Sequence, residues 1–112
     1  MKVKAQSLRI GNYITYTQEG TDTVQVTIST LEAIISGSEY HGIPLDEDWL
    51  RRWGFTRRGH WFDKESALEV KVIAIADGLY IDMGGNYIQI RTVHGFQNIW
   101  FALVGHELVR DK

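Results

Sequence analysis

The chain has 112 residues, a length typical of one domain, so we expect a single domain over residues 1–112. It contains no cysteine, which excludes disulfides, thiolate metal sites and a cysteine nucleophile. The formal net charge of −2 argues against a nucleic-acid coat protein, and no apolar run is long enough to cross a membrane, so we expect a cytoplasmic protein.

The first third of the chain has the pattern of antiparallel strands. In residues 23–29 three apolar residues alternate with polar ones, and this period of two predicts a half-buried strand. Residues 9–17 are rich in β-forming types, and the polar segment 18–22 is expected to join the two runs as a hairpin. Residues 30–35 continue as a predicted third strand. Such a three-stranded meander is common in small SH3-like barrels, and by analogy this part of the fold is expected to be SH3-like.

A short helix is predicted from Asp46 to Trp53. Asp46 suits the N-cap position, and the two acidic residues that follow it favour the positive end of the helix dipole. Gly54 stands where a left-handed C-terminal cap is expected. The predicted buried stripe consists of Trp49, Leu50 and Trp53.

The second half of the chain has strand patterns again and then a second helix. The expected strands are 55–57, 60–62, 68–76, 79–82 and 87–90. Turns are expected at residues 77–78 and 84–86. From Val93 the apolar residues recur at helical spacing, with Thr92 as the cap and Gly105 at the end. The predicted fold is α+β: mostly antiparallel strands, in two sheets or one continuous curved sheet, with two short helices.

Three segments of the chain together resemble one family. They are residues 8–13 (LRIGNY), 43–55 (IPLDEDWLRRWGF) and 93–108 (VHGFQNIWFALVGHEL). They resemble a family of small, uncharacterised proteins of Bacteroidota genomes, mobile elements and phages, which tends to show an LRIGN-type start, a PL-acidic-WL-GF helix and a VHxLQNLYFALTGxEL-type terminal helix. The resemblance implies a phage or mobile-element accessory protein in the cytoplasm of a bacterial host. It implies no catalytic residues.

The stretch from Trp49 to Phe62 is the most informative part of the sequence. It carries four of the seven arginines, three of the four tryptophans and no acidic residue. Guanidinium groups bind phosphate oxygens and aromatic rings stack on bases, so this mixture is typical of a site for a nucleotide-like anion. The candidate ligand-binding residues here are Arg51, Arg52, Trp53, Arg57, Arg58, His60 and Trp61. In the alternative interpretation, the tryptophans are core residues and the arginines form a solvated face that upstream acidic residues neutralise.

Two polar residues of the terminal helix complete the candidate set. His94 and Asn98 lie one helical turn apart, a spacing that suits the polar edge of a ligand; alternatively, they hydrogen-bond strands and loops. The four histidines, which also include His41, His60 and His106, lack the spacing of metal ligands, and no acid–base set is recognisable. We therefore expect no metal, no cofactor and no enzymatic activity.

These observations predict a non-enzymatic protein that binds a small anionic, nucleotide-derived ligand. With the resemblance, the expected role is the sequestration of a host immune signal, an anti-defence sponge. The alternatives are a protein-interaction module that inhibits a host protein and, against the acidic net charge, a nucleic-acid-binding accessory. The four Trp, five Tyr and four Phe exceed what so small a core encloses, so we also expect a homo-oligomer, a dimer or higher, and no membrane partner.

Overall fold

The computed structural model confirms an α+β fold with antiparallel strands in two sheets. It describes residues 3–16, 22–64, 70–75, 78–82, 86–105 and 107–108. No helix within this described part is long and apolar enough to cross a membrane.

The described residues form two compact units. Unit 1 contains the residues up to Pro44 together with Thr92–Ile99, and unit 2 contains Leu45–Arg91 together with the residues from Trp100 onwards. The boundary therefore runs through the terminal helix. The expectation of a single domain stays a prediction.

Unit 1 holds a small sheet and a helix. Its elements are the 3-10 helix η1 (Ala5–Ser7), β1 (Tyr13–Thr15), β2 (Val24–Gln25), α1 (Ile28–Ile35) and β3 (His41–Gly42). The strands are antiparallel in the order β2-β1-β3. The buried core of this unit consists of Val3, Leu8, Ile14 and Val26, with Val24, Leu31, Ile34 and Tyr40 packed against it.

The structure corrects the prediction for residues 23–35. The strand β2 covers two residues, and α1 replaces the predicted third strand 30–35, so the meander is wrong and the SH3-like analogy loses its basis. Thr27 and Thr30 form a capping box: each side chain accepts a hydrogen bond from the backbone N–H of the other residue, both at 3.3 Å. This cap and the packing of the helix outweigh the weak helix propensity of its β-branched residues.

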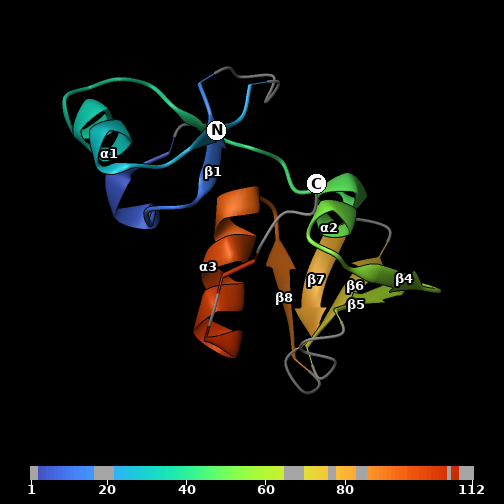
Figure 1. The fold of residues 1–112 in the computed structure, drawn as a ribbon. Coiled ribbons are helices and arrows are strands. Elements are labelled where there is room, and N and C mark those ends of the chain that lie inside the picture. The colour runs from blue at the N-terminus through green and yellow to red at the C-terminus, as the bar shows by residue number, and fades with distance from the viewer. Residues whose placement is uncertain are drawn as a thin grey trace. The chain divides into compact units, whose positions relative to one another are not determined.

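Unit 2 contains a five-stranded antiparallel sheet in which neighbours along the chain are neighbours in space (Figure 1). Its strands are β4 (Thr56–Arg58), β5 (Trp61–Asp63), β6 (Lys71–Ile75), β7 (Gly78–Asp82) and β8 (Tyr87–Ile90). The five predicted strands are thus confirmed with small shifts of their ends, and residues 68, 69 and 76 of the predicted strand 68–76 lie outside the described residues. The predicted turns at residues 77–78 and 84–86 lie largely outside the described residues.

The sheet of unit 2 has one buried face and one open face. Phe62, Val72 and Ile81 lie directly opposite one another on the three central strands, and all three are fully buried; we call their side the inner face. One residue along each strand, side chains point the other way. The outer face therefore carries Trp61, Ile73 and Tyr80, which are only partly buried.

The helix α2 (Glu47–Arg52) matches the sequence prediction at both ends. The Asp46 carboxylate accepts a hydrogen bond from the Trp49 backbone N–H at 3.1 Å, and Gly54 has φ = 85°. The predicted stripe, Trp49, Leu50 and Trp53, is buried. The terminal helix α3 (Val93–Val104) is likewise confirmed, with Thr92 accepting from the Gly95 N–H at 3.2 Å.

Substitution of Asp46 tests how much the N-cap of α2 contributes to the stability of the protein. Asp46→Ala is expected to lower the free energy of unfolding by about 1 kcal/mol, because the Trp49 N–H loses its acceptor. Asp48→Ala is the matched control, since it removes an exposed carboxylate of the same turn that forms an ion pair with Arg52, and its effect should be smaller. Urea denaturation followed by circular dichroism measures both; equal effects would contradict the assigned cap.

Candidate functional site

The nine residues predicted as a ligand site fall into two groups. The arginines, Trp53, His60 and Trp61 lie in unit 2, whereas His94 and Asn98 lie in unit 1.

All four arginines of the Trp49–Phe62 stretch have carboxylate partners. The pairs are Arg51–Glu47 (2.6 Å), Arg57–Glu47 (2.9 Å), Arg52–Asp48 (2.9 Å) and Arg58–Asp63 (3.0 Å). Glu47 lies between two guanidinium groups, one on its own helix and one on β4. An anionic ligand would have to compete with these carboxylates. This geometry matches the interpretation of the arginines as a locally neutralised face.

Trp53 lies in the core of unit 2. Its side chain is fully buried, and its ring packs against that of Trp49 with 5.3 Å between the centroids. A buried ring cannot stack on a ligand at the surface. Among the predicted aromatic residues, this leaves His60 and Trp61.

His60 and Trp61 line a hollow of about 520 Å³ in unit 2. The other lining residues are Lys71, Ile73, Ala74, Ile75, Asp82 and Tyr87. The register places Lys71 directly opposite Asp82, and Asp82 directly opposite Tyr87, on three successive strands. The hollow thus lies over the outer face of the sheet, and its volume is within the usual range for small-molecule sites.

The hollow combines aromatic rings with a small number of polar groups. The Lys71 ammonium lies 5.3 Å from the centroid of the Trp61 ring, and His60 meets the same ring edge-on at 5.9 Å. The Trp61 indole N–H is buried and has no hydrogen-bond partner among the described residues. Lys71 and Asp82 contribute one positive and one negative charge. The site therefore suits a flat, partly apolar molecule with few charges.

Sequence reasoning missed Lys71, Asp82 and Tyr87. Each belongs to a strand that the sequence predicts, and the alternation within each strand gives the face on which it lies. The relative register of β6, β7 and β8 is what brings the three together, and no motif in the sequence specifies that register.

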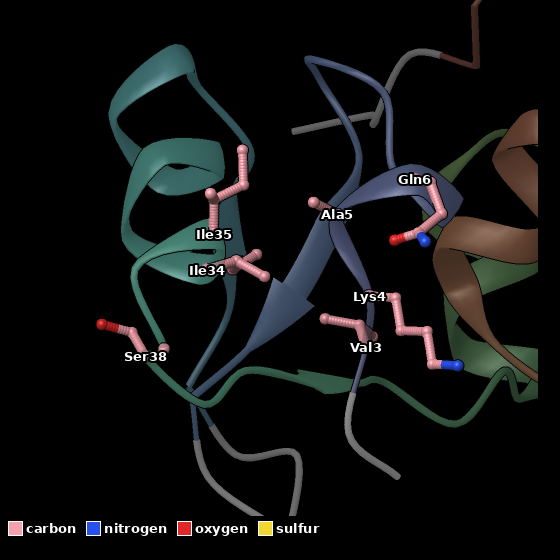
Figure 2. A pocket seen from close by; sticks show the side chains of 8 residues that line it. Val3, Lys4, Ala5, Gln6, Ile34, Ile35 and Ser38 are labelled. Atoms are coloured by element: carbon pink, nitrogen blue, oxygen red, sulfur yellow. The ribbon is translucent and has the colours of Figure 1, made fainter.

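A second hollow, in unit 1, has a different character (Figure 2). It measures about 280 Å³ and lies between the N-terminal segment and α1. Val3, Ala5 and Ile34 point into the space between these elements, while the Lys4 side chain points away from α1. Its lining includes Lys4 and several apolar side chains, and it has no aromatic residue on which a base could stack.

Asn98 is occupied by hydrogen bonds within unit 1. Its amide oxygen accepts from the Arg9 Nε at 2.8 Å and from the Asn12 side chain at 3.0 Å, and its amide nitrogen donates to the Ser7 carbonyl at 3.0 Å. The neighbouring Gln97 donates to the Gly11 carbonyl and accepts from the Tyr13 N–H. This amide network ties the LRIGN segment to α3, which is the structural alternative foreseen for Asn98.

His94 is buried against the backbone of β3. A Cβ atom on Gly42 would come within 3.1 Å of the His94 Cε1 atom, so glycine provides the room for the ring. The Nδ1 atom has no hydrogen-bond partner in the described part of the chain. Burial lowers the pKa of His94 below its usual value, so the neutral ring is favoured in the folded protein.

The amide network is testable by truncation. Asn98→Ala is expected to lower the free energy of unfolding by about 1–3 kcal/mol, because it removes the acceptor shared by Arg9 and Asn12. Gln25→Ala is the matched control: it also removes an amide that bonds a loop carbonyl, but at an exposed position and 3.4 Å. Chemical denaturation compares the two. A loss no larger for Asn98→Ala than for Gln25→Ala would contradict a structural role.

The lowered pKa of His94 predicts a pH dependence of stability. The unfolded chain protonates this ring near its ordinary pKa of about 6.5, at a higher pH than the folded chain does. The free energy of unfolding should therefore fall as the pH drops from about 7.5 to about 5.5. His94→Gln removes the titrating group and should show a smaller fall in denaturation experiments at the two pH values. An unchanged fall in the variant would contradict the assignment.

The chain matches no protein-family model, no curated protein and no solved structure. Within the described residues, no three His, Asp or Glu side chains come together in a way that could hold a metal ion. Of the two hollows described above, the one on the outer face of unit 2 is the one lined by aromatic residues.

Proposed function

We propose that the chain is a non-enzymatic binding protein for a small nucleotide-like ligand, and that the ligand occupies the hollow on the outer face of the unit 2 sheet. The observation that carries the proposal is the placement of Trp61, Lys71 and Tyr87 around one hollow of about 520 Å³. Two of the residues predicted from the sequence, His60 and Trp61, are part of it.

The side chains that line the hollow could each bind a different part of a nucleotide-like ligand. Aromatic side chains such as Trp61 and Tyr87 offer flat faces on which a base stacks, a contact worth about 1–3 kcal/mol per base. The Lys71 ammonium supplies the cation for a phosphate oxygen. The Asp82 carboxylate accepts hydrogen bonds from a ribose hydroxyl or a base N–H.

The balance of charge limits how anionic the ligand is. Lys71 is the one cationic lysine or arginine among the lining residues, Asp82 opposes it, and the arginines of the Trp49–Phe62 stretch are paired with carboxylates. A ligand with one or two phosphate charges fits this balance better than a polyphosphate or a nucleic-acid strand, which needs a row of cations along its backbone.

The biological role follows from the resemblance to phage and mobile-element proteins. A protein that only binds a nucleotide signal lowers its free concentration by mass action and needs no catalytic group. Sequestration of a host immune signal is therefore the role we propose. The principal alternative is a protein partner docked on the same outer face, which a stoichiometric pull-down from host lysate would reveal.

Calorimetric titration tests the site. We expect the wild-type protein to bind at least one member of a panel of nucleoside monophosphates, cyclic dinucleotides and ADP-ribose. Trp61→Ala and Lys71→Met should each weaken that binding by about tenfold or more, since each removes a contact of at least about 1.4 kcal/mol.

The matched control is the double variant Arg51→Ala with Arg52→Ala, which removes two arginines of the sequence-predicted set that do not line the hollow. Its affinity should equal that of the wild type, and circular dichroism should show that all variants are folded. Absence of binding to the whole panel, or an equal loss in the arginine variant, would overturn the proposed site.

A further inference from the structure

The strand β8 forms an uncharged edge of the unit 2 sheet. Its sequence is Tyr87-Ile88-Gln89-Ile90, and β7 is its one neighbour among the described strands. Tyr87 on the outer face is 55% exposed, and Ile88 on the inner face is 44% exposed. Ile81, which lies opposite Ile88 on β7, is fully buried. Within unit 2, β7 is the one described strand that pairs with β8 over Tyr87–Ile90, and just after β8 the Leu45 N–H donates to the Arg91 carbonyl at 3.0 Å.

The opposite edge of the same sheet is protected. The edge strand β4 carries Arg57 and Arg58, whose guanidinium groups are held by Glu47 and Asp63. Charged side chains on an edge strand discourage pairing with a further strand, because the incoming strand would have to desolvate them. The two edges thus differ in charge, one of the properties that control the addition of a strand.

We propose that two copies of the chain pair through β8, antiparallel to each other, around a twofold axis at Ile88. The paired sheets would form one sheet of ten strands, five from each copy. A twofold axis perpendicular to the sheet relates each residue of one strand to a residue directly opposite it on the other strand. The axis therefore passes between two copies of the same residue. Ile88 then lies opposite Ile88 of the partner subunit, and Tyr87 lies opposite Gln89 of the partner subunit.

A second copy suits this edge because the strand is complementary to itself. Pairing at Ile88 brings two apolar side chains together and buries them. The charged residue nearest in sequence to β8 is Arg91, three positions from the axis. The two Arg91 side chains are thus about 20 Å apart along the paired strands, and no like charges face each other.

The pairing has a consequence for the ligand site, and this consequence alone rests on the proposed function. A twofold axis perpendicular to the sheet keeps the outer faces of both copies on the same side. Tyr87 lines the hollow, so the partner's Gln89 would lie beside its rim and add an amide group to it. The dimer would then present two hollows on one continuous face.

Single-cysteine variants test the interface directly, because the chain has no cysteine of its own. Opposite Cβ atoms in an antiparallel pair are about 4.5–5.5 Å apart, close enough for a disulfide after a small adjustment. Under mild oxidation Ile88→Cys should form a covalent dimer at least about tenfold faster than the control Ile75→Cys. Ile75 belongs to the same sheet and is similarly exposed, at 47%, but it lies on β6, the central strand, which has a neighbour on both sides. Equal rates would overturn the proposal.

Sedimentation of the protein without ligand provides the second measurement. The wild type should dimerise with rising concentration between about 10 μM and about 1 mM, as expected for a small interface. Ile88→Lys should stay monomeric and Ile75→Lys should behave as the wild type. If Ile88→Lys fails to fold, Tyr87→Lys places the charge on the other face of the same edge.

The outcomes separate this proposal from the proposed function. A wild-type protein that is monomeric at all concentrations, or that pairs only with an added foreign peptide, overturns the self-pairing whatever the ligand titrations show. A dimer that binds no nucleotide keeps the interface and overturns the ligand site.

Discussion

The burial of Phe62, Val72 and Ile81 on the inner face is the constraint on which the site of unit 2 depends. These side chains lie opposite one another on β5, β6 and β7 and are fully removed from water. A shift of one residue in any of these strands would turn its apolar side chains to the solvent, at a cost of several kcal/mol. The register is therefore held by the core, and the outer face follows from it: with Phe62 turned inward, Trp61 must point outward.

Charge in this protein is balanced at short range, and this balance separates the surface from the site. The net charge of −2 hides a stretch with four arginines. Each of these arginines is held by a carboxylate that α2 or β5 brings within 3.0 Å. Glu47 alone serves two of them. The hollow of unit 2 has a different charge pattern, in which Lys71 lies directly opposite Asp82 on the neighbouring strand, beside aromatic rings.

Side-chain hydrogen bonds contribute to the stability of unit 1 in addition to its apolar core. Its sheet is small, with strands of two or three residues, and side-chain amides of α3 hold the segment before β1. Asn98 and Gln97 lie in α3, and Arg9 and Asn12 lie in the segment before β1. Their hydrogen bonds contribute to the stability of the unit, since a buried amide without its partners would destabilise it.

The sequence by itself determined the elements whose signals are local. The Asp46 cap and Gly54 bound α2 within a few residues, and the alternation of Tyr87–Ile90 is that of β8. Residues 28–35 are apolar enough for a strand or a helix, and the capping box together with packing against the core of unit 1 decided for the helix. The site was also decided by tertiary structure. Trp61 could be predicted from the arginine- and tryptophan-rich sequence around it. Lys71 and Tyr87 come close to it only through the pairing of strands, whose register depends on which face of the sheet is buried in the core.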